Sequence, residues 1–332
     1  MNKRFATLDD VAAAAGLSRS HVSRALSNHP GVTPETRLHI QNVANRIGYR
    51  PNLAARNLAS TRTRNIGIMI GEPFNPFQML LAQQVDIALG EAGYDAVVSL
   101  RAYHEGPVLS EAERLRELRV AGIICISTPH EDETIRRIAD MLPCVYIGKE
   151  VDDERVYTVT GADRVGVSTT VAHLISSGHK DIAFISGGSS PGSARRLDGY
   201  RDAMSAASLT PREIIGGATL AVGRESALKL MGETPRPTAI IAHNDLVAMG
   251  AAAAVQEWGL KVPDDVSLVG FDDIPYAAAD MLSLTTLRQD PATQARAAVA
   301  AMLHLLEDGD PVARSQLLPV ELQLRRSIAP RP

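Results

Sequence analysis

The sequence predicts two parts, an all-α helix-turn-helix domain at the N-terminus and a larger α/β core whose two lobes each contain a doubly wound parallel sheet. Three observations lead to this prediction. Helix-capping and turn residues fill the first fifty positions, apolar strand-like runs alternate with helical stretches after residue 64, and positive charge is concentrated in the first part. The length of 332 residues also exceeds what one simple core accommodates.

Charge divides unevenly along the chain. Residues 1–64 contain ten lysines and arginines and three acids, a net charge of +7, whereas the whole chain carries −4 and the remainder therefore −11. A basic segment attached to an acidic body indicates a polyanionic partner for the basic segment alone. Because lysine and arginine displace counterions from phosphates, double-stranded DNA is the expected partner.

Capping residues define the first three helices. Thr7 can cap a first helix in which Leu8 and Val11 share one face. Gly16 suits the turn that follows, and Ser18 can cap a second helix over 19–26. Thr33 followed by proline starts a third helix, which ends at Gly48 and is expected to bury Leu38, Val43 and Ile47.

Three short helices with a tight turn after the first indicate a helix-turn-helix, whose second helix enters the major groove. Arg19, Ser20 and His21 lie at the N-terminal end of that helix, where side chains reach base edges, and arginine can pair with guanine through two hydrogen bonds. The alternative is a three-helix interaction domain with a solvated polar face. The coincidence of the polar face with the basic segment favours DNA binding.

Seven apolar runs after residue 64 predict buried parallel strands, with helices such as Gln78–Ala92 and Asp163–Ser177 between them. Ligands of such sheets bind beyond the carboxyl ends of the strands, and with two lobes the cleft between them is the natural site. The runs are 66–70, 95–100, 122–126, 144–148, 182–186, 239–242 and 266–270.

Three strings, TLDDVAAAAGLSRSHVSRAL, GVTPETRLHIQNVANRIGYRPN and LAARNLAS, resemble the head of the lactose/galactose repressor (LacI/GalR) family, and the similarity continues to the C-terminus. The resemblance implies a homodimeric transcriptional repressor of carbohydrate-metabolism genes with a periplasmic-binding-protein-like core. It also implies a near-palindromic operator, with Arg19, Ser20 and His21 as the positions that read it. The full predicted DNA-binding set is Thr7, Leu8, Ser18, Arg19, Ser20, His21, Ser23, Arg24, Ser27, Thr33, Asn52, Ala55 and Leu58.

Residues 52–60 are short and helical in propensity, and such a segment does not hold a helix alone in water. In the family this segment is a hinge helix that orders on operator DNA, and Leu58 matches the leucine that wedges into the minor groove, with Ala55 on the same face. The alternative is an ordinary linker with a chance leucine.

The resemblance and the strand pattern together predict the domain boundaries. Residues 1–50 form the DNA-binding domain, 51–64 the hinge and linker, and 65–332 the effector-binding and dimerisation core. Within the core the first lobe is predicted over 65–160 and 292–319, and the second over 161–291 and 320–328.

Polar residues at predicted strand ends and one predicted lobe crossover supply a candidate effector site, in which Arg196 matches the effector-binding arginine of the family. Asp, Asn and Arg side chains can make paired hydrogen bonds to vicinal sugar hydroxyls, and a sugar ring would lie on Phe77 or Phe271. Gly148 stands where many relatives carry an acid, and with Lys149 nearby this favours a sugar acid or sugar phosphate beside a neutral sugar. The predicted set is Asn75, Phe77, Gln78, Lys149, Arg196, Asn244, Phe271, Asp272 and Gln289, with Asp245 expected to cap a helix instead.

Several function classes are disfavoured. Cys125 and Cys144 lie in apolar runs and offer neither a metal cluster nor a disulfide framework, so no metal or cofactor is expected. No secretory signal or bilayer-spanning run is visible, and we expect a cytoplasmic protein. The Gly-rich segment 187–193 matches neither nucleotide-binding pattern. An oxidoreductase or a transport binding protein would leave the basic helix-turn-helix unexplained, so the chain is predicted not to be an enzyme.

Overall fold

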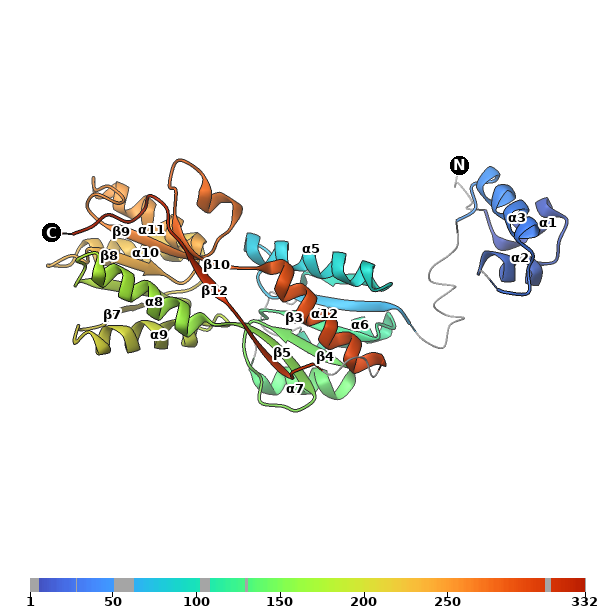
Figure 1. Cartoon of the computed structure of the whole chain (residues 1–332), viewed down its shortest axis with the longest axis horizontal. Helices are drawn as coiled ribbons and strands as arrows, with labels where there is room; N and C mark the ends of the chain where they lie inside the picture. Colours follow the sequence, from blue (N-terminus) through green and yellow to red (C-terminus); the bar gives the residue numbers. More distant parts are fainter. Residues whose placement is uncertain are drawn as a thin grey trace. The chain divides into compact units, whose positions relative to one another are not determined.

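The computed structural model describes residues 6–27, 29–50, 63–101, 108–128, 131–307 and 312–331. The chain divides into two compact units, Met1–Thr63 and Arg64–Pro332. The first unit is helical, and the second contains two sheets flanked by helices (Figure 1). No helix in the described ranges is both long enough and apolar enough to cross a membrane.

The first unit contains α1 (Leu8–Ala15), α2 (Arg19–Leu26) and α3 (Pro34–Arg46). Thr7 and Asp10 form a reciprocal capping box at the start of α1, and Gly16 ends the helix with a left-handed φ of 66°. Val11, Val22 and Ile40 form the core of the three helices. The expectation for Leu38 is wrong, because its side chain is exposed and α3 instead turns Ile40 inward.

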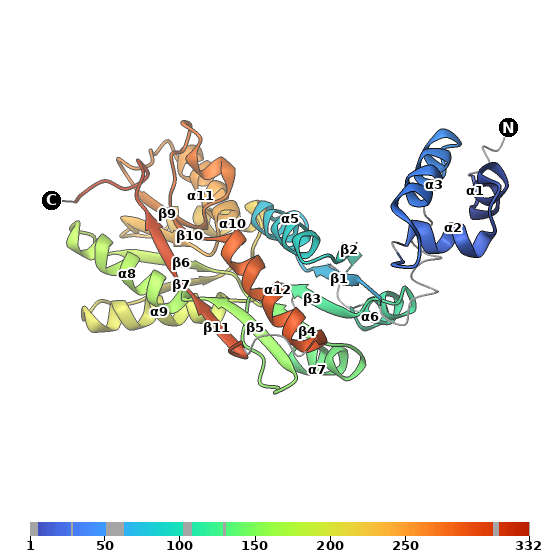
Figure 2. The same ribbon diagram turned by 45° about the vertical axis from the view of Figure 1, so that its right-hand side comes forward.

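The first lobe of the second unit is a six-stranded sheet with neighbours in the order β11-β5-β4-β3-β1-β2, all parallel. Helices α5 and α12 cover one face of the sheet, and α6 and α7 cover the other (Figure 2). Buried side chains of these helices pack against the strands. The elements are β1 (Asn65–Ile70), α5 (Pro76–Glu91), β2 (Asp95–Ser99), α6 (Val108–Glu117), β3 (Gly122–Ile126), α7 (Asp132–Met141), β4 (Cys144–Ile147), β5 (Val156–Gly161), α12 (Pro291–Glu307) and β11 (Ser315–Leu318).

The second lobe repeats this plan with the order β12-β10-β9-β8-β6-β7, in which only the β10–β12 pair among the described strands is antiparallel. Helices α10 and α11 cover one face, and α8 and α9 the other. The elements are α8 (Asp163–Ser176), β6 (Ile182–Ser186), α9 (Ser193–Ala206), β7 (Arg212–Ile215), α10 (Leu220–Met231), β8 (Ala239–Ala242), α11 (Asp245–Glu257), β9 (Ser267–Asp272), the 3-10 helix η2 (Pro275–Ala278), β10 (Thr285–Gln289) and β12 (Val320–Gln323).

The chain passes between the lobes at three places. It crosses from β5 to α8, from β10 to α12 and from β11 to β12, where Pro319 alone separates the two strands (Figure 1). Strand ends and helix starts of both lobes therefore converge on the same region.

All seven predicted runs are strands, but the sequence reading missed β5, β7, β10, β11 and β12. Strands β5 and β10 are rich in buried threonines, such as Thr158 and Thr286, and so show no continuous apolar run. Strands β7 and β11 lie at sheet edges and alternate in exposure over only four residues each. Helix α5 begins two residues earlier than expected, because Asn75 caps it before Pro76.

Candidate functional site

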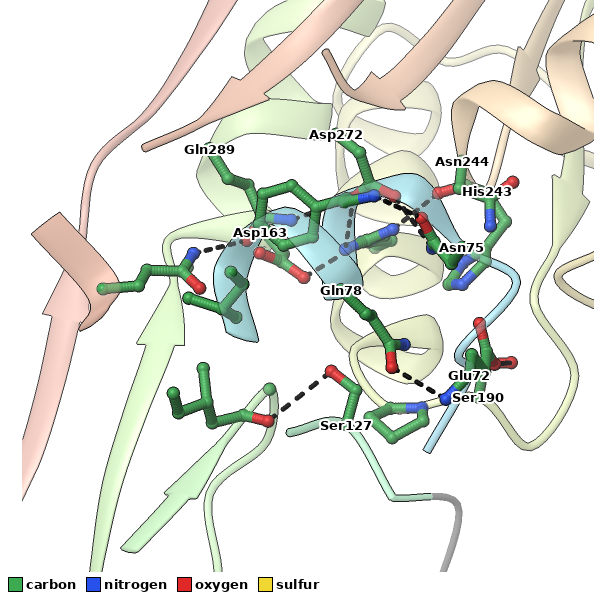
Figure 3. A pocket seen from close by; sticks show the side chains of 18 of the residues that line it. Glu72, Asn75, Gln78, Ser127, Asp163, Ser190, His243, Asn244, Asp272 and Gln289 are labelled. Atoms are coloured by element: carbon green, nitrogen blue, oxygen red, sulfur yellow. Dashed lines mark hydrogen bonds and ion pairs between the residues drawn. The ribbon is translucent and has the colours of Figure 1, made fainter. Parts of the chain in front are cut away.

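A cavity with about 530 Å³ of empty space, part of it open to solvent, lies where the two lobes meet (Figure 3). Its walls come from the ends of β1 and β4 and the start of α5 in the first lobe, and from segments after β6, β8 and β9 in the second. This is the position expected for a ligand of two parallel sheets. The main polar and charged lining residues are Glu72, Asn75, Gln78, Ser127, Asp163, Ser190, Arg196, His243, Asn244, Asp272, Gln289 and Gln294.

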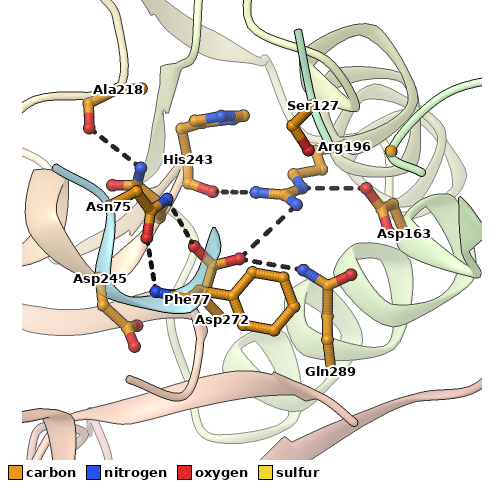
Figure 4. A network of polar contacts seen from close by, with 12 residues as sticks. Asn75, Phe77, Ser127, Asp163, Arg196, Ala218, His243, Asp245, Asp272 and Gln289 are labelled. Atoms are coloured by element: carbon orange, nitrogen blue, oxygen red, sulfur yellow. Dashed lines mark hydrogen bonds and ion pairs between the residues drawn. The ribbon is translucent and has the colours of Figure 1, made fainter. Parts of the chain in front are cut away.

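Arg196 on α9 is the centre of the polar network (Figure 4). Its Nε donates to Asp163 Oδ2 at 3.0 Å, and its Nη1 donates to the carbonyl oxygen of His243 at 2.6 Å. Its Nη2 lies 3.8 Å from Asp272 Oδ1, and the guanidinium carbon lies 3.5 Å from the centre of the Phe271 ring. The guanidinium group is therefore fixed on both edges and on one face before a ligand arrives.

Asp272 ends β9 with a backbone φ of 107°, a rare conformation for a residue with a side chain. Its Oδ1 accepts from Gln289 Nε2 at 3.0 Å, and Gln289 Oε1 accepts from Gln294 at 2.9 Å. Burial raises the pKa of Asp272 to about 6, although the positive charge of Arg196 opposes the rise. Gln289, at the end of β10 where the chain crosses to α12, thus brings its side-chain amide into the site.

Besides the Gln294–Gln289 bond at the crossover, three further side-chain hydrogen bonds between described residues join the lobes around the cavity. Asn75 Nδ2 donates to Asp272 Oδ2 at 3.3 Å, and Ser190 Oγ donates to Glu72 Oε1 at 3.1 Å (Figures 3 and 4). Arg195 Nη2 donates to the carbonyl oxygen of Gly148 at 2.8 Å. Each of these bonds requires the two lobes to lie close together at the cavity.

Two buried acceptors or donors on the cavity wall have no hydrogen-bond partner within the described residues. They are Asp163 Oδ1 and His243 Nδ1, and both residues are at most 3% exposed. Burial lowers the pKa of His243 well below its ordinary value, and the charge of Arg196 lowers it further, so the imidazole is neutral. An unpaired buried polar atom costs free energy that a bound ligand can recover.

Seven predicted effector residues line the cavity and two do not. Lys149 pairs with Asp132 at 2.8 Å outside it, and the buried Phe271 ring packs against Arg196 instead of facing a ligand. Of the two aromatic residues expected to support a ring, Phe77 lines the cavity. The predicted residues that line it are Asn75, Phe77, Gln78, Arg196, Asn244, Asp272 and Gln289.

The sequence reading missed Glu72 and Asp163, which changes the charge expected for the cavity. Three carboxylates, those of Glu72, Asp163 and Asp272, face one guanidinium among the described lining residues. These carboxylates do not favour the anionic ligand that Gly148 and Lys149 suggest, and Lys149 does not line the cavity. Glu72 lies two residues after the end of β1, so a search for polar residues at the ends of predicted strands finds it. Asp163 begins α8 shortly after β5, and it can be found only if the polar segment β5 is recognised as a strand.

Asn244 lines the cavity and in addition caps a helix, whereas Asp245 has a different role from the one expected. Asn244 caps α11 through Oδ1, which accepts from Val247, and its Nδ2 donates to the carbonyl oxygen of Ala218. Asp245 does not cap the helix. Its two carboxylate oxygens accept from the Ile274 amide and the Thr286 hydroxyl, beneath the cavity.

The second candidate surface is on the first unit. Helix α2 exposes Arg19, Ser20, Ser23 and Arg24, with His21 half-buried at its edge. Arg19 lies 3.6 Å from Asp9 in an exposed ion pair, which phosphate or base contacts can replace at small cost. Three other predicted DNA-binding residues, Thr7, Ser18 and Thr33, cap α1, α2 and α3. Leu8 is half-buried against the core of the unit, and Ser27 is exposed. The predicted hinge residues Asn52, Ala55 and Leu58 lie outside the described residues.

Comparisons with known proteins match both units. A model of bacterial regulatory proteins of the lacI family matches residues 7–52, and a model of periplasmic binding protein-like domains matches residues 171–328. The HTH-type transcriptional regulator DegA of Bacillus subtilis (strain 168) is 32% identical over 333 residues, with 98% of each chain covered.

Solved structures give the same result. The lac repressor dimer bound to operator and the anti-inducer ONPF is similar with a TM-score of 0.87 at 27% identity, covering 98% of this chain and 100% of that one. The complex of the transcriptional regulator CelR with cellobiose has a TM-score of 0.71 at 26% identity, covering 97% of this chain and 99% of that one.

Proposed function

The chain belongs to the lacI family of bacterial regulatory proteins, and we propose that within this family it is a repressor whose operator affinity is controlled by a sugar or sugar derivative held between its two lobes. It is a DNA-binding transcriptional regulator and not an enzyme. The observation that carries the effector proposal is the cavity around Arg196, because its polar residues come from both lobes.

DNA recognition is assigned to α2. Its exposed N-terminal turn carries Arg19 and Ser20, and a helix of this kind places that turn against base edges in the major groove. Ser23 and Arg24 lie one turn later, and we assign them contacts to phosphates or bases. We propose that the net positive charge of residues 1–64 strengthens binding, because its lysines and arginines release counterions from the phosphates of the duplex.

Effector control is assigned to the hydrogen bonds that join the lobes. A ligand in the cavity contacts Asn75 and Glu72 from one lobe and Asp272 and Ser190 from the other, which are the partners in two of those bonds. The ligand must bind one arrangement of the lobes more tightly than the other, since equal affinity transmits nothing. The first lobe follows residues 51–64, so a change in its position is passed to the predicted hinge.

We assign the protein to the bacterial cytoplasm as a homodimer. The lac repressor relative is a dimer on its operator, and two heads of this chain would fit two half-sites about one helical turn apart. Apolar side chains that α5 and β2 expose, including Met79, Ile87 and Val98, provide a surface for the second copy.

The DNA-binding assignment is tested by selecting duplexes from a random pool and measuring their affinity for variants. We expect Arg19→Ala to weaken the selected duplex about 10- to 100-fold, the range for loss of one good base contact. The matched control is Arg201→Ala, which removes an exposed arginine of α9 and should leave the affinity unchanged. Equal losses in the two variants, or no selected duplex, would contradict the assignment.

A further inference from the structure

The polar atoms of the cavity wall are mostly acceptors once their internal hydrogen bonds are counted. Arg196 already donates to Asp163 and to the His243 carbonyl. Four of the five side-chain amides that line the cavity also donate within the protein: Asn75 and Gln289 to Asp272, Gln294 to Gln289, and Asn244 to Ala218, whereas Gln78 accepts from the Glu72 amide. A ligand that only accepts hydrogen bonds would therefore share donors that are already engaged within the protein.

The acceptors on the same wall are less fully occupied. Asp163 Oδ1 is buried without a partner within the described residues, although its other oxygen pairs with Arg196. A Cβ added at Gly161 would come within 2.5 Å of Asp163 Oδ1 and 3.1 Å of Gln289 Oε1, so these two acceptors border the same small space. A ligand group in that space gains hydrogen bonds only if it donates.

Of the three carboxylates on the cavity wall, Glu72 has no positively charged hydrogen-bond partner among the described residues. Its Oε1 accepts from the neutral Ser190 hydroxyl, and Arg196 acts on it only through longer-range charge. Burial raises its pKa, which means that the site disfavours its negative charge while no cation is present. With Asp163 and Asp272 sharing Arg196, the charge that the cavity lacks is positive.

We propose, on the basis of the sugar-controlled regulation inferred above, that the effector is a polyhydroxylated ring carrying a protonated amino group, with the ammonium paired to Glu72 and a ring hydroxyl donating to Asp163 Oδ1. Glu72 belongs to the first lobe and Asp163 to the second, so one ligand contacts carboxylates from both. Sugar acids and sugar phosphates are excluded, because they bring acceptors and negative charge to a wall that already has both.

The test compares three forms of one ring on the full-length protein. Neutral, 2-amino and uronate forms of glucose, galactose and mannose are titrated, with the melting temperature and the affinity for the selected duplex as readouts. We expect at least one amino sugar to raise the melting temperature and to bind at least about tenfold more tightly than its neutral and uronate counterparts, the scale of one charge-assisted hydrogen bond. That preference should decline at alkaline pH, where the amine loses its proton.

Two variants separate the ammonium pair from general effects. Glu72→Gln keeps an acceptor for Ser190 and removes the charge, so the preference for the amino form should disappear while binding of the neutral form remains. Glu154→Gln makes the same change on an exposed loop away from the cavity, and it should keep the preference. Equal melting temperatures of the two ligand-free variants show that the comparison is not one of folding.

The outcomes distinguish this inference from the proposed function. A neutral sugar or uronate that binds as tightly as the amino form and changes duplex affinity overturns the ammonium assignment but supports control by a sugar. The same is true of a preference for the amino form that survives in Glu72→Gln. If no compound changes either readout, the amino-sugar and the sugar assignments both fail, while duplex binding itself is unaffected.

Discussion

At the scale of single residues, the site depends on the planar group of Arg196. One guanidinium contacts Asp163, the His243 carbonyl and the ring of Phe271, and lies within ion-pair distance of Asp272. A lysine ammonium keeps the charge but cannot make these contacts from one position. Replacing Arg196 by lysine therefore tests whether the site needs only a positive charge at this position or also the planar shape of the guanidinium group.

We expect Arg196→Lys to lower the free energy of unfolding by about 2–3 kcal/mol, because buried carboxylates lose part of their compensation. It should also weaken the effector at least about tenfold. Arg201→Lys on the same helix is the control, since its pair with Glu213 is half exposed and should contribute under about 1 kcal/mol. Urea denaturation of both variants measures the difference. A loss no larger than that of the control would show that charge alone suffices at position 196.

A second residue beneath the cavity makes stability depend on pH. Burial, and after it the negative charge of Asp272, together raise the pKa of Asp245 to about 8 from an ordinary value of 3.8. Between these values the folded protein holds a proton that the unfolded chain releases, so this residue lowers the free energy of unfolding as pH rises from about 4 to about 8.

Asp245→Asn removes that dependence, and its amide oxygen can still accept from the Ile274 amide while its amide nitrogen donates to the Thr286 hydroxyl oxygen. We expect the variant to gain stability relative to the parent between pH 5 and pH 8, on the scale of about 1.4 kcal/mol for each unit of pKa difference. Urea denaturation at both pH values gives the result, with the exposed Asp86→Asn as the control. A parallel pH dependence in variant and parent would contradict a raised pKa at Asp245.

The limits of sequence interpretation are also visible in single residues. Arg196 and Asp272 could be predicted because a resemblance or a strand end marks them. Asp163 could not, because β5 before it is built from buried threonines and valines and does not look like a buried strand. Phe271 lies at the end of a predicted strand, as expected, but no local sequence pattern indicates that its ring faces Arg196 and not the cavity.

At the scale of elements, caps and apolar runs carry the most information. Thr7, Ser18 and Thr33 cap the helices that the sequence predicts, because a capping bond is local and involves neighbours three residues apart. Strands β7, β11 and β12 are short edge strands that depend on a partner distant in sequence. The prediction that α3 buries Leu38 failed for a related reason. Whether Leu38 or Ile40 faces the core depends on how α3 packs against the other two helices, which the local sequence does not specify.

Helix α5 links a cap to the arrangement of the lobes. Asn75 Oδ1 accepts from the Phe77 amide, while Nδ2 donates across the cavity to Asp272. Asn75→Asp keeps the cap and places a second carboxylate beside Asp272, so we expect it to open the lobes and weaken effector binding. Asn75→Ser keeps a cap without the repulsion and is the control.

Small-angle scattering of the ligand-free proteins measures the opening. The radius of gyration should rise in Asn75→Asp and not in Asn75→Ser, and lowering the pH below about 5 should reverse the rise as one carboxylate takes up a proton. Unchanged scattering of Asn75→Asp at neutral pH would mean that repulsion between carboxylates at positions 75 and 272 does not separate the lobes.

At the scale of the whole molecule, the two compact units have opposite charge. The family assignment explains why a chain with a net charge of −4 binds a polyanion, because the DNA-binding unit, residues 1–63, carries +6 and the acidic remainder contains the cavity proposed for the effector. Average composition hides this division, and only the position of each charge along the chain reveals it.

The same division predicts how operator affinity depends on salt. A dimer whose heads contact about 6–10 phosphates should bind about 10³- to 10⁵-fold more weakly at 200 mM than at 50 mM salt. Arg24→Gln on α2 should reduce the slope of log affinity against log salt by about one for each phosphate that the variant no longer neutralises, hence by about two in a dimer. Arg224→Gln, on an exposed helix of the acidic unit, should leave the slope unchanged. Equal slopes for the parent and Arg24→Gln would show that Arg24 does not bind a phosphate, and a flat salt response in the parent would contradict electrostatic binding by the basic unit.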